Sequence, residues 1–410
     1  MEDSQFYDVL IIGGGAAGFF TAINIAENRP DLSVVILERG SEVLSKVKVS
    51  GGGRCNVTHG EFDAQQLVEK YPRGRQELRG PFSRFMTGDT MEWFESRGVS
   101  LKIEDDGRIF PTSDSSQTII DCFTEAAQNA GVEVHLQQPV RQIRREEFWQ
   151  LITKTTQYTA QHLIVATGSN PKIWKILEAL GHTIVPPVPS LFTFNIDDSR
   201  IADLQGISIN ASIEVHDDTN KKILESEGPT LITHWGLSGP GVLKISAWGA
   251  RLLSPLDYRF EIVVNWLFDL EVQDAIDQML DQKEISPQKK LINTPCFELS
   301  KRFWQRQLEC IGIGSEVVWV QASNRQLEAI ATALTQARFK VTGKSTFKEE
   351  FVTAGGIELK EVNFKRFESK LHPNLYFAGE ILNIDAITGG FNFQNAWTGA
   401  YLVSKAICDA

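Results

Sequence analysis

The sequence predicts an α/β fold in which segments from both ends of the chain build one domain and two other modules are inserted between them. Two apolar strands that stop at glycine-containing turns, one near each terminus, predict the shared domain. Between them the hydrophobic pattern changes first to strict alternation and then to a helical period, which predicts a β-rich module followed by helices. A chain of 410 residues is long enough for two or three domains.

The first strand and its turn are typical of a dinucleotide-binding unit. Residues 8–18 read DVLIIGGGAAG, and Gly13, Gly15 and Gly18 fit the pattern GxGxxG. The first glycine permits the tight turn, the second lets a pyrophosphate approach the backbone, and the third lets the helix pack closely on the sheet. The next strand, SVVILE, ends at Glu38, whose carboxylate can accept hydrogen bonds from ribose hydroxyls.

The region from Glu38 to residue 190 mixes short helices and strands. A glycine-rich segment at 50–56 precedes a polar, helix-leaning region. Residues 107–116 are rich in turn formers, and we expect Ser113 or Asp114 to cap a helix over 116–130. Short strands are predicted at 132–136, 140–144, 148–153 and 158–166. The last of these, ending HLIVATG, is a continuous apolar run and is predicted to be fully buried.

The middle of the chain changes character twice. Apolar residues alternate with polar ones from Ile207 to Val215, as in a strand with one solvated face, so residues 191–265 predict a small barrel or sandwich. From about 268 to 336 the apolar residues recur at helical spacing. A short strand at 339–342 returns to the β module.

The C-terminal segment resembles the N-terminal one, because in both an apolar strand ends at a glycine and a helix follows. The apolar strand LYFAGE stops at Gly379 and Glu380, and TGGFNF at 388–393 leads into a helix. In flavoproteins an acid in this place binds the ribityl chain, and the following helix directs its positive end at the flavin pyrimidine. This arrangement, with the strand end ATG at 166–168, favours FAD over NAD.

Composition limits the partners and the compartment. Apolar residues make up 42% of the chain, charged residues 23%, and the formal net charge is −11, which argues against nucleic-acid and anionic-membrane binding. The five cysteines are scattered and include no CxxC, so we expect neither disulfides nor a metal site. With no apolar run near membrane-spanning length and no signal peptide, we expect a cytoplasmic protein of undetermined oligomeric state.

Five longer motifs resemble one family, the BaiN/YhiN-type NAD(P)/FAD-dependent oxidoreductases. They are SGGGRCN at 50–56, DGRIFPTSDS at 107–116, THWGLSGPG at 233–241, TAGGIEL at 353–359 and LYFAGEILNIDAITGGFNFQNAW at 375–397. The resemblance implies a FAD-binding, Rossmann-like domain of the two-dinucleotide-binding type, interrupted by a β-barrel-like domain and a small helical domain. We place these at 1–190 with 347–410, at 191–267 with 337–346, and at 268–336, respectively.

The resemblance also implies roles for particular residues. The ADP half of FAD would lie on the N-terminal glycines and Glu38, and residues 46 and 50–56 would follow the cofactor toward the flavin. Val140 would contact adenine, and Glu380 the ribityl or phosphate region. The full set of predicted cofactor contacts is Gly13, Gly15, Ala16, Ala17, Gly18, Glu38, Arg39, Lys46, Ser50, Gly51, Gly52, Gly53, Arg54, Cys55, Asn56, Val140, Ala166, Thr167, Gly168, Gly379, Glu380, Gly390, Phe391, Asn392 and Phe393.

The sequence indicates candidate general acids and bases less clearly than it indicates cofactor contacts. His234, at the end of a predicted strand, is the candidate general acid or base, with a packing histidine in a tight turn as the alternative. His59 offers the same two interpretations. Cys55 is either a redox residue or a small apolar residue packed by the flavin, and the lack of a nearby partner cysteine favours the second.

We predict a FAD-dependent oxidoreductase that transfers a hydride between the flavin and a small organic substrate. No second GxGxxG follows a strand, so NADH or NADPH, as the transient donor, would bind without a Rossmann unit of its own. The alternatives are a flavin-dependent oxidase of an amine or hydroxy compound, a flavin-dependent nucleic-acid-modifying protein, and a flavin-binding redox sensor without turnover.

Overall fold

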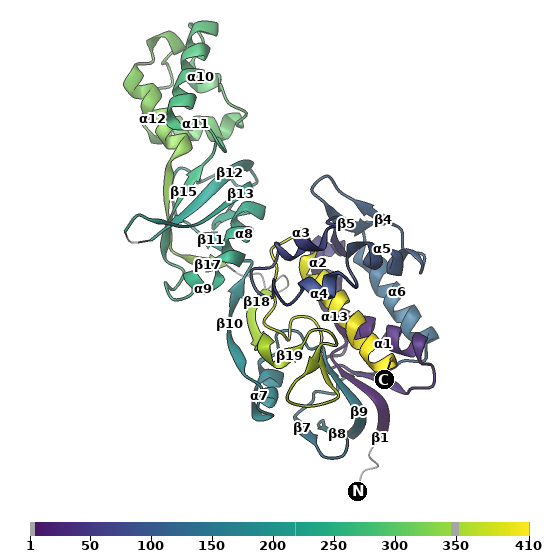
Figure 1. Cartoon of the computed structure of the whole chain (residues 1–410). Helices are drawn as coiled ribbons and strands as arrows, with labels where there is room; N and C mark the ends of the chain where they lie inside the picture. The colour runs from purple at the N-terminus through teal and green to yellow at the C-terminus, as the bar shows by residue number, and fades with distance from the viewer. Residues whose placement is uncertain (1–4, 218, 346–351, 410) are drawn as a thin grey trace. The chain divides into compact units, whose positions relative to one another are not determined.

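The protein forms two compact units, each built around its own sheet (Figure 1). The structure, a computed structural model, describes residues 5–217, 219–345 and 352–409. One unit comprises Met1–Val188 with Lys348–Ala410, and the other Pro189–Phe347. The boundary that we predicted between residues 346 and 347 lies outside the described residues, and the three-part division stays a prediction.

The first unit is organised on a mainly parallel sheet. The order is β19 (Val362–Asn363), β20 (Glu368–Ser369), β21 (Leu375–Phe377), β9 (Gln157–Val165), β1 (Gln5–Ile12), β2 (Val34–Leu37) and β6 (Glu133–His135). The four central pairings, from β21 to β6, are parallel, and the register sets Leu10 opposite both Val35 and Leu163. The carboxyl ends of these strands therefore meet at one edge, where ligands bind in open α/β sheets.

Strand β9 joins two parts of the sheet. Its first half pairs with β8 (Trp149–Ile152), which pairs in turn with β7 (Gln142–Arg145), whereas its second half lies between β1 and β21. Exposure alternates over the first half, and the last four residues are all buried. The prediction of a buried strand is therefore confirmed for His162–Val165, whereas the first half of the strand is partly exposed.

Two helices from opposite ends of the chain pack together on this sheet. They are α1 (Ala16–Asn28) and α13 (Phe391–Cys408), seen in purple and yellow in Figure 1. Their contact is lined by aromatic rings: the Trp397 ring lies 5.3 Å from Phe20 and 5.6 Å from Phe123, between centroids. Trp397 is fully buried, and its indole N–H donates to the Val57 carbonyl at 2.9 Å.

Smaller elements complete the first unit. They are α2 (Ser45–Gly53), α3 (Ala64–Val68), α4 (Arg79–Phe82), α5 (Thr87–Glu95), α6 (Ser116–Asn129), α7 (Pro171–Ala179), the 3₁₀ turn η3 (Leu359–Glu361), and the sheet β3 (Thr58–His59), β5 (Arg108–Pro111) and β4 (Leu101–Ile103). The cap of α6 corrects our prediction. Ser115, not Ser113 or Asp114, caps the helix, because the Asp114 carboxylate is held by Lys102.

Among the strand pairs that were not predicted, one is unusually rich in proline. Strand β10 (Ile184–Ser190) pairs with β18 (Val352–Ile357), although β10 contains three prolines. Proline cannot donate to a ladder, so the sequence IVPPVPS argues against a strand. A two-stranded sheet tolerates it because both of its strands are edge strands.

The second unit contains a sheet that returns on itself. Its order is β16 (Ala337–Val341), β15 (Phe260–Asn265), β12 (Ser208–His216), β13 (Lys222–Thr233), β14 (Gly236–Ser238), β11 (Thr193–Asn195) and β17 (Gly343–Ser345). The first and last strands of this path are separated in sequence only by Thr342. One stretch of chain thus pairs with β15 and then with β11, which gives a barrel-like circuit.

Helices complete the second unit and share its core. They are α8 (Pro240–Trp248), α9 (Ala250–Leu253), α10 (Val272–Ile285), α11 (Lys301–Cys310) and α12 (Asn324–Thr335), with the 3₁₀ turns η1 (Leu291–Asn293) and η2 (Trp319–Gln321). A single hydrophobic cluster runs from sheet residues such as Ile213 through Trp266 to Phe303 and Leu327. Across the described ranges, no helix combines the length and apolar character needed to cross a membrane.

The packing between α1 and α13 yields a stability prediction. Trp397→Ala should lower the free energy of unfolding of the first unit by about 3–5 kcal/mol, because it leaves a cavity among aromatic rings and removes a buried hydrogen bond. Urea denaturation followed by circular dichroism measures the change. Phe62→Ala, at a ring that is 55% exposed, is the control and should change the value by under about 0.5 kcal/mol. Equal losses in the two variants would contradict this packing.

Candidate functional site

The three glycines of the N-terminal motif have different surroundings. Gly13 has φ +112°, and a Cβ there would lie 2.5 Å from the Ala166 carbonyl oxygen. A Cβ at Gly18 would lie 2.0 Å from the Gly13 carbonyl oxygen, so the helix can approach the strand only without a side chain. At Gly15 a Cβ would meet nothing within 4 Å. Two glycines therefore serve packing, and the third leaves its backbone open.

Helix α1 begins without a cap. Its N-cap residue is Gly15, no side chain accepts from the first turn, and the first turn contains no acid. The backbone N–H groups at Ala16 and Ala17 thus keep the partial positive charge of a helix N-terminus. Such a terminus suits an anionic group.

Glu38 stands beside this turn. One carboxylate oxygen accepts from the Gly14 N–H at 2.9 Å and the other from the Gly40 N–H at 2.7 Å. The Gln138 N–H donates to the Glu38 carbonyl, which brings the segment leading to the buried Val140 alongside. Arg39 is exposed. The structure thus brings Glu38 and the motif glycines together.

The strand ends from the two halves of the chain meet at Gly168 and Glu380. The Lys46 ammonium lies 2.6 Å from the Glu380 carboxylate, and a Cβ at Gly168 would lie 3.6 Å from that carboxylate. A Cβ at Gly379 would lie 3.4 Å from Ala17 Cβ in α1 and 3.8 Å from Ala396 Cβ in α13. Gly379 therefore lies between the first turn of α1 and the second turn of α13. Thr167, next to Gly168, is partly exposed.

Helix α13 also begins at a glycine without a side-chain cap. Gly390 has φ +92°, and the first turn of the helix carries no acid. The Asn392 amide holds the preceding loop by accepting from the Ala386 N–H at 3.0 Å. Phe391 stacks on His59 with centroids 4.5 Å apart, and Phe393 stacks on Trp397. This start is thus rigidly held while its N–H groups remain available.

The glycine-rich segment Ser50–Asn56 is a left-handed turn at the end of α2. Gly51, Gly52, Gly53 and Cys55 all have positive φ. With its amide oriented to satisfy both ends, Asn56 accepts from the Gly390 N–H at 2.9 Å and donates to the Thr58 carbonyl at 2.8 Å. A Cβ at Gly52 or Gly53 would meet nothing within 4 Å. This turn therefore has bare backbone beside the start of α13.

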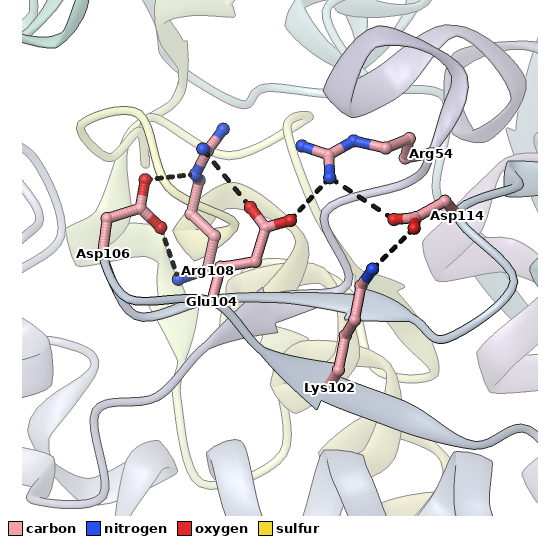
Figure 2. Close-up of polar contacts among 6 residues, drawn as sticks. All are labelled: Arg54, Lys102, Glu104, Asp106, Arg108 and Asp114. Atoms are coloured by element: carbon pink, nitrogen blue, oxygen red, sulfur yellow. Dashed lines mark hydrogen bonds and ion pairs between the residues drawn. The ribbon is translucent and has the colours of Figure 1, made fainter.

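Arg54 points into an ion-pair network (Figure 2). Its guanidinium contacts Glu104 at 2.6 Å and Asp114 at 3.4 Å. The sequence predicted Arg54 as a cofactor contact. In the structure its positive charge is paired with the carboxylates of Glu104 and Asp114. Sequence spacing does not reveal such partners, because they lie 50 and 60 residues away.

Cys55 is fully buried, and burial raises the pKa of its thiol to about 12. A thiol with so high a pKa is protonated at neutral pH and is a poor nucleophile. The packing interpretation of Cys55 therefore fits the structure, and a redox role does not.

The two candidate histidines lie in different units. His59, in the first unit, stacks on Phe391, and burial lowers the pKa of its imidazole, so the neutral form prevails at physiological pH. His234 belongs to the second unit, where it is exposed in the two-residue turn between β13 and β14. The pairing of His59 with Phe391 was missed, because the two residues are distant in sequence.

The first-unit residues fit FAD. Two uncapped helix starts and bare glycine backbone are donor sets for a pyrophosphate and for a flavin ring, and Glu38 is an acceptor for ribose hydroxyls. The side-chain oxygen of Asn395 and Nδ1 of His59 are buried beside the α13 start, and within the described ranges neither has a hydrogen-bond partner. Such orphaned polar atoms are typical of a ligand site.

Comparison with known proteins identifies the family. The profile of the family described as "HI0933-like protein Rossmann domain" matches residues 7–406. The chain is 27% identical over 413 residues to a ribosomal RNA dihydrouridine synthase of Escherichia coli (strain K12), covering 98% of each. It is 27% identical over 412 residues to a 3-dehydro-bile acid delta(4,6)-reductase of Clostridium scindens, covering 97% of this chain and 98% of that protein.

Solved structures share the fold. A 3-ketosteroid-delta4-(5alpha)-dehydrogenase from Rhodococcus jostii RHA1 superposes with a TM-score of 0.53 at 11% identity, covering 100% of this chain and 98% of that one. The quinol fumarate reductase subunit FrdA of E. coli gives 0.52 at 12% identity, covering 100% and 71%. The chain belongs to the HI0933-like, BaiN/YhiN-type family of flavoproteins and is a FAD-dependent oxidoreductase.

The different surroundings of Gly15 and Gly18 predict that one glycine is needed for FAD binding and the other for folding. Gly15→Val should give a folded, colourless protein, because the new side chain fills open space where a pyrophosphate would approach. Gly18→Val, its matched control, should lose much of its thermal stability, because its Cβ collides with the Gly13 carbonyl. Visible absorbance and thermal denaturation measure the two effects. A yellow Gly15→Val protein with stoichiometric FAD would contradict this site.

The cysteine environments predict an order of reactivity. At pH 8 a thiol reagent should modify the exposed Cys310 first and Cys55 last, because the raised pKa and burial suppress the Cys55 thiolate. Peptide mass spectrometry after timed labelling measures the order, and labelling in denaturant shows that all five thiols can react. Cys55→Ala should keep its FAD. Rapid labelling of Cys55 in the folded protein would contradict its packing role.

Proposed function

We propose that this FAD-dependent oxidoreductase of the HI0933-like family adds a hydride to a C=C bond conjugated with a carbonyl group, with NADH or NADPH as the electron donor. The observation that carries the proposal is the approach of two helices with uncapped starts to Gly379, which lies near Ala17 in the first turn of α1 and near Ala396 in the second turn of α13. One start suits the pyrophosphate and the other the flavin pyrimidine.

The proposed roles follow the surroundings of each residue. The open backbone at Gly15 and the N–H groups of Ala16 and Ala17 would hold the pyrophosphate. Glu38 would exchange a backbone N–H for ribose hydroxyls, and Lys46 and Glu380 would border the ribityl chain. The other residues that would contact the cofactor are Arg39, Val140, Ala166, Thr167, Gly168 and the turn from Ser50 to Asn56.

The start of α13 would favour hydride chemistry. FAD, when bound, supplies the site that accepts a hydride from the donor and passes it to the substrate. Negative charge gathers on the pyrimidine ring during reduction, and the N–H groups from Phe391 to Phe393 would stabilise it by about 1 kcal/mol. Gly390 supports this role because its left-handed conformation turns the chain into the helix without adding a side chain.

The substrate class follows from what two dissimilar relatives have in common. One is named for making dihydrouridine in ribosomal RNA and the other for reducing a 3-dehydro-bile acid at delta(4,6). Both names describe saturation of a C=C bond conjugated with a carbonyl. We therefore carry over the bond type, not either substrate. For protonation of the second carbon we propose His234, on its residue type and exposure.

An RNA base is the second candidate substrate. It is favoured by the relatives in E. coli and Haemophilus influenzae, both named ribosomal RNA dihydrouridine synthase and each matched over 98% of this chain. The net charge of −11 weighs against it. A purified uridine-containing ribosomal RNA, assayed beside a conjugated enone, tests the two candidates on equal terms.

An anaerobic half-reaction tests the proposal. Purified protein should show the flavin absorption bands, NADH or NADPH should bleach them, and a conjugated enone or the RNA should restore them. A stopped-flow record at the flavin maximum measures both steps, and a saturated ketone is the negative control. A flavin that ignores both nicotinamides but is bleached by an amine or hydroxy compound would favour the oxidase alternative. Absence of any flavin would refute the proposal.

A further inference from the structure

Six charged side chains form a continuous chain beside the glycine-rich turn (Figure 2). Their signs alternate in the order Lys102, Asp114, Arg54, Glu104, Arg108 and Asp106. The links at Lys102–Asp114, Arg54–Glu104 and Arg108–Asp106 are 2.6, 2.6 and 2.7 Å long, and the other two are 3.4 Å. Arg54 is the only member that comes from the turn.

The Arg54 guanidinium is also fixed by an aromatic platform. Its Cζ lies 3.8 Å from the centroid of the Phe110 ring, which is fully buried. The same ring supports the turn from another direction, because a Cβ at Gly51 would lie 3.0 Å from Phe110 Cε1. Two acids and one ring thus define both the position and the plane of the guanidinium.

The turn that Arg54 anchors is strained. Positive φ angles occur at Gly51, Gly52, Gly53 and Cys55, and Arg54 between them has ordinary helical geometry. A left-handed conformation is unfavourable for a residue such as Cys55, so surrounding contacts must maintain it. On the other side of the turn, Asn56 contacts the Gly390 N–H. The segment is therefore held between the ion-pair network and the start of α13.

We propose that Arg54 is a positioning residue that fixes the Ser50–Asn56 turn in the shape required by the flavin end of FAD. This inference rests on the proposed function. Since the guanidinium is already engaged by Glu104, Asp114 and Phe110, it acts through the backbone of the turn and not as a ligand of the phosphates. Arg54 thereby links two separate sequence motifs, at 50–56 and 107–116, through its contacts with Phe110 and Asp114.

The chain offers a matched control for Arg54. Arg97 also combines an ion pair with an aromatic contact: it pairs with the Glu27 carboxylate, and its Cζ lies 3.9 Å from the Trp93 ring centroid. It belongs to the same unit and follows α5, and its contacts are with Glu27, Trp93 and Ser96 instead of with the turn. Loss of either arginine removes similar contacts, so the two variants separate positioning from stability.

The experiment measures the rate at which holoenzyme releases FAD, from the rise in free-flavin fluorescence, together with the visible circular dichroism of bound flavin. Arg54→Gln should release FAD about tenfold faster and alter the flavin dichroism, because the turn loses its anchor. Arg54→Lys keeps the charge without the planar fork, so an intermediate, about threefold, increase is expected. Arg97→Gln should lower the thermal midpoint similarly but leave FAD release within about twofold of the wild type.

The effect of salt on FAD release gives a second measurement, and its main part needs only the wild-type protein. The network residues are partly exposed, so 1 M NaCl should speed FAD release from the wild type and have a smaller effect on Arg54→Lys. Equal release rates and identical dichroism in the wild type, Arg54→Gln and Arg97→Gln would overturn the inference while leaving FAD binding intact. Should the wild type bind no FAD, the proposed function itself would fail.

Discussion

The parallel ladder β21–β9–β1 is the constraint on which the site depends. Backbone hydrogen bonds hold the strand that ends at Phe377 beside β9, and β9 beside the strand that ends at Ile12. Because all three strands run in the same direction, their carboxyl ends coincide. Both helices pass close to this edge at Gly379, where a Cβ would lie 3.4 Å from Ala17 Cβ in α1 and 3.8 Å from Ala396 Cβ in α13. Buried aromatic contacts between α1 and α13 then fix the second helix against the first.

Polar groups at this edge are arranged for an anionic, ring-containing ligand. Neither α1 nor α13 has a side-chain cap or an acid in its first turn, so the positive partial charge of both helix termini is left without a side-chain acceptor. Charged side chains nearby are paired with each other, as Lys46 is with Glu380 and Arg54 with Glu104. The backbone N–H groups thus provide the hydrogen-bond donors for such a ligand, and the side-chain ion pairs hold the surrounding segments in place.

The relatives show how one such scaffold can serve different substrates. A ribosomal RNA dihydrouridine synthase and a bile acid reductase each match nearly the whole chain at 27% identity. Their names share a bond type but not a substrate size. All the predicted FAD contacts belong to the first unit, and the barrel-like unit is inserted into the chain between their two groups. A fold of this kind can keep its chemistry while substrate recognition changes.

The sequence alone determined the apolar strands that end at the two glycine turns, the glycine pattern, Glu38 and the Gly379–Glu380 end, because steric and periodic requirements act over a few neighbouring residues. It also indicated both terminal segments as parts of one domain. Only the tertiary structure decided that Lys46 pairs with Glu380, that Arg54 turns toward Glu104 and Phe110, and that burial leaves Cys55 inert. Those outcomes depend on side chains that meet across long sequence separations, where no local period or motif specifies the partner.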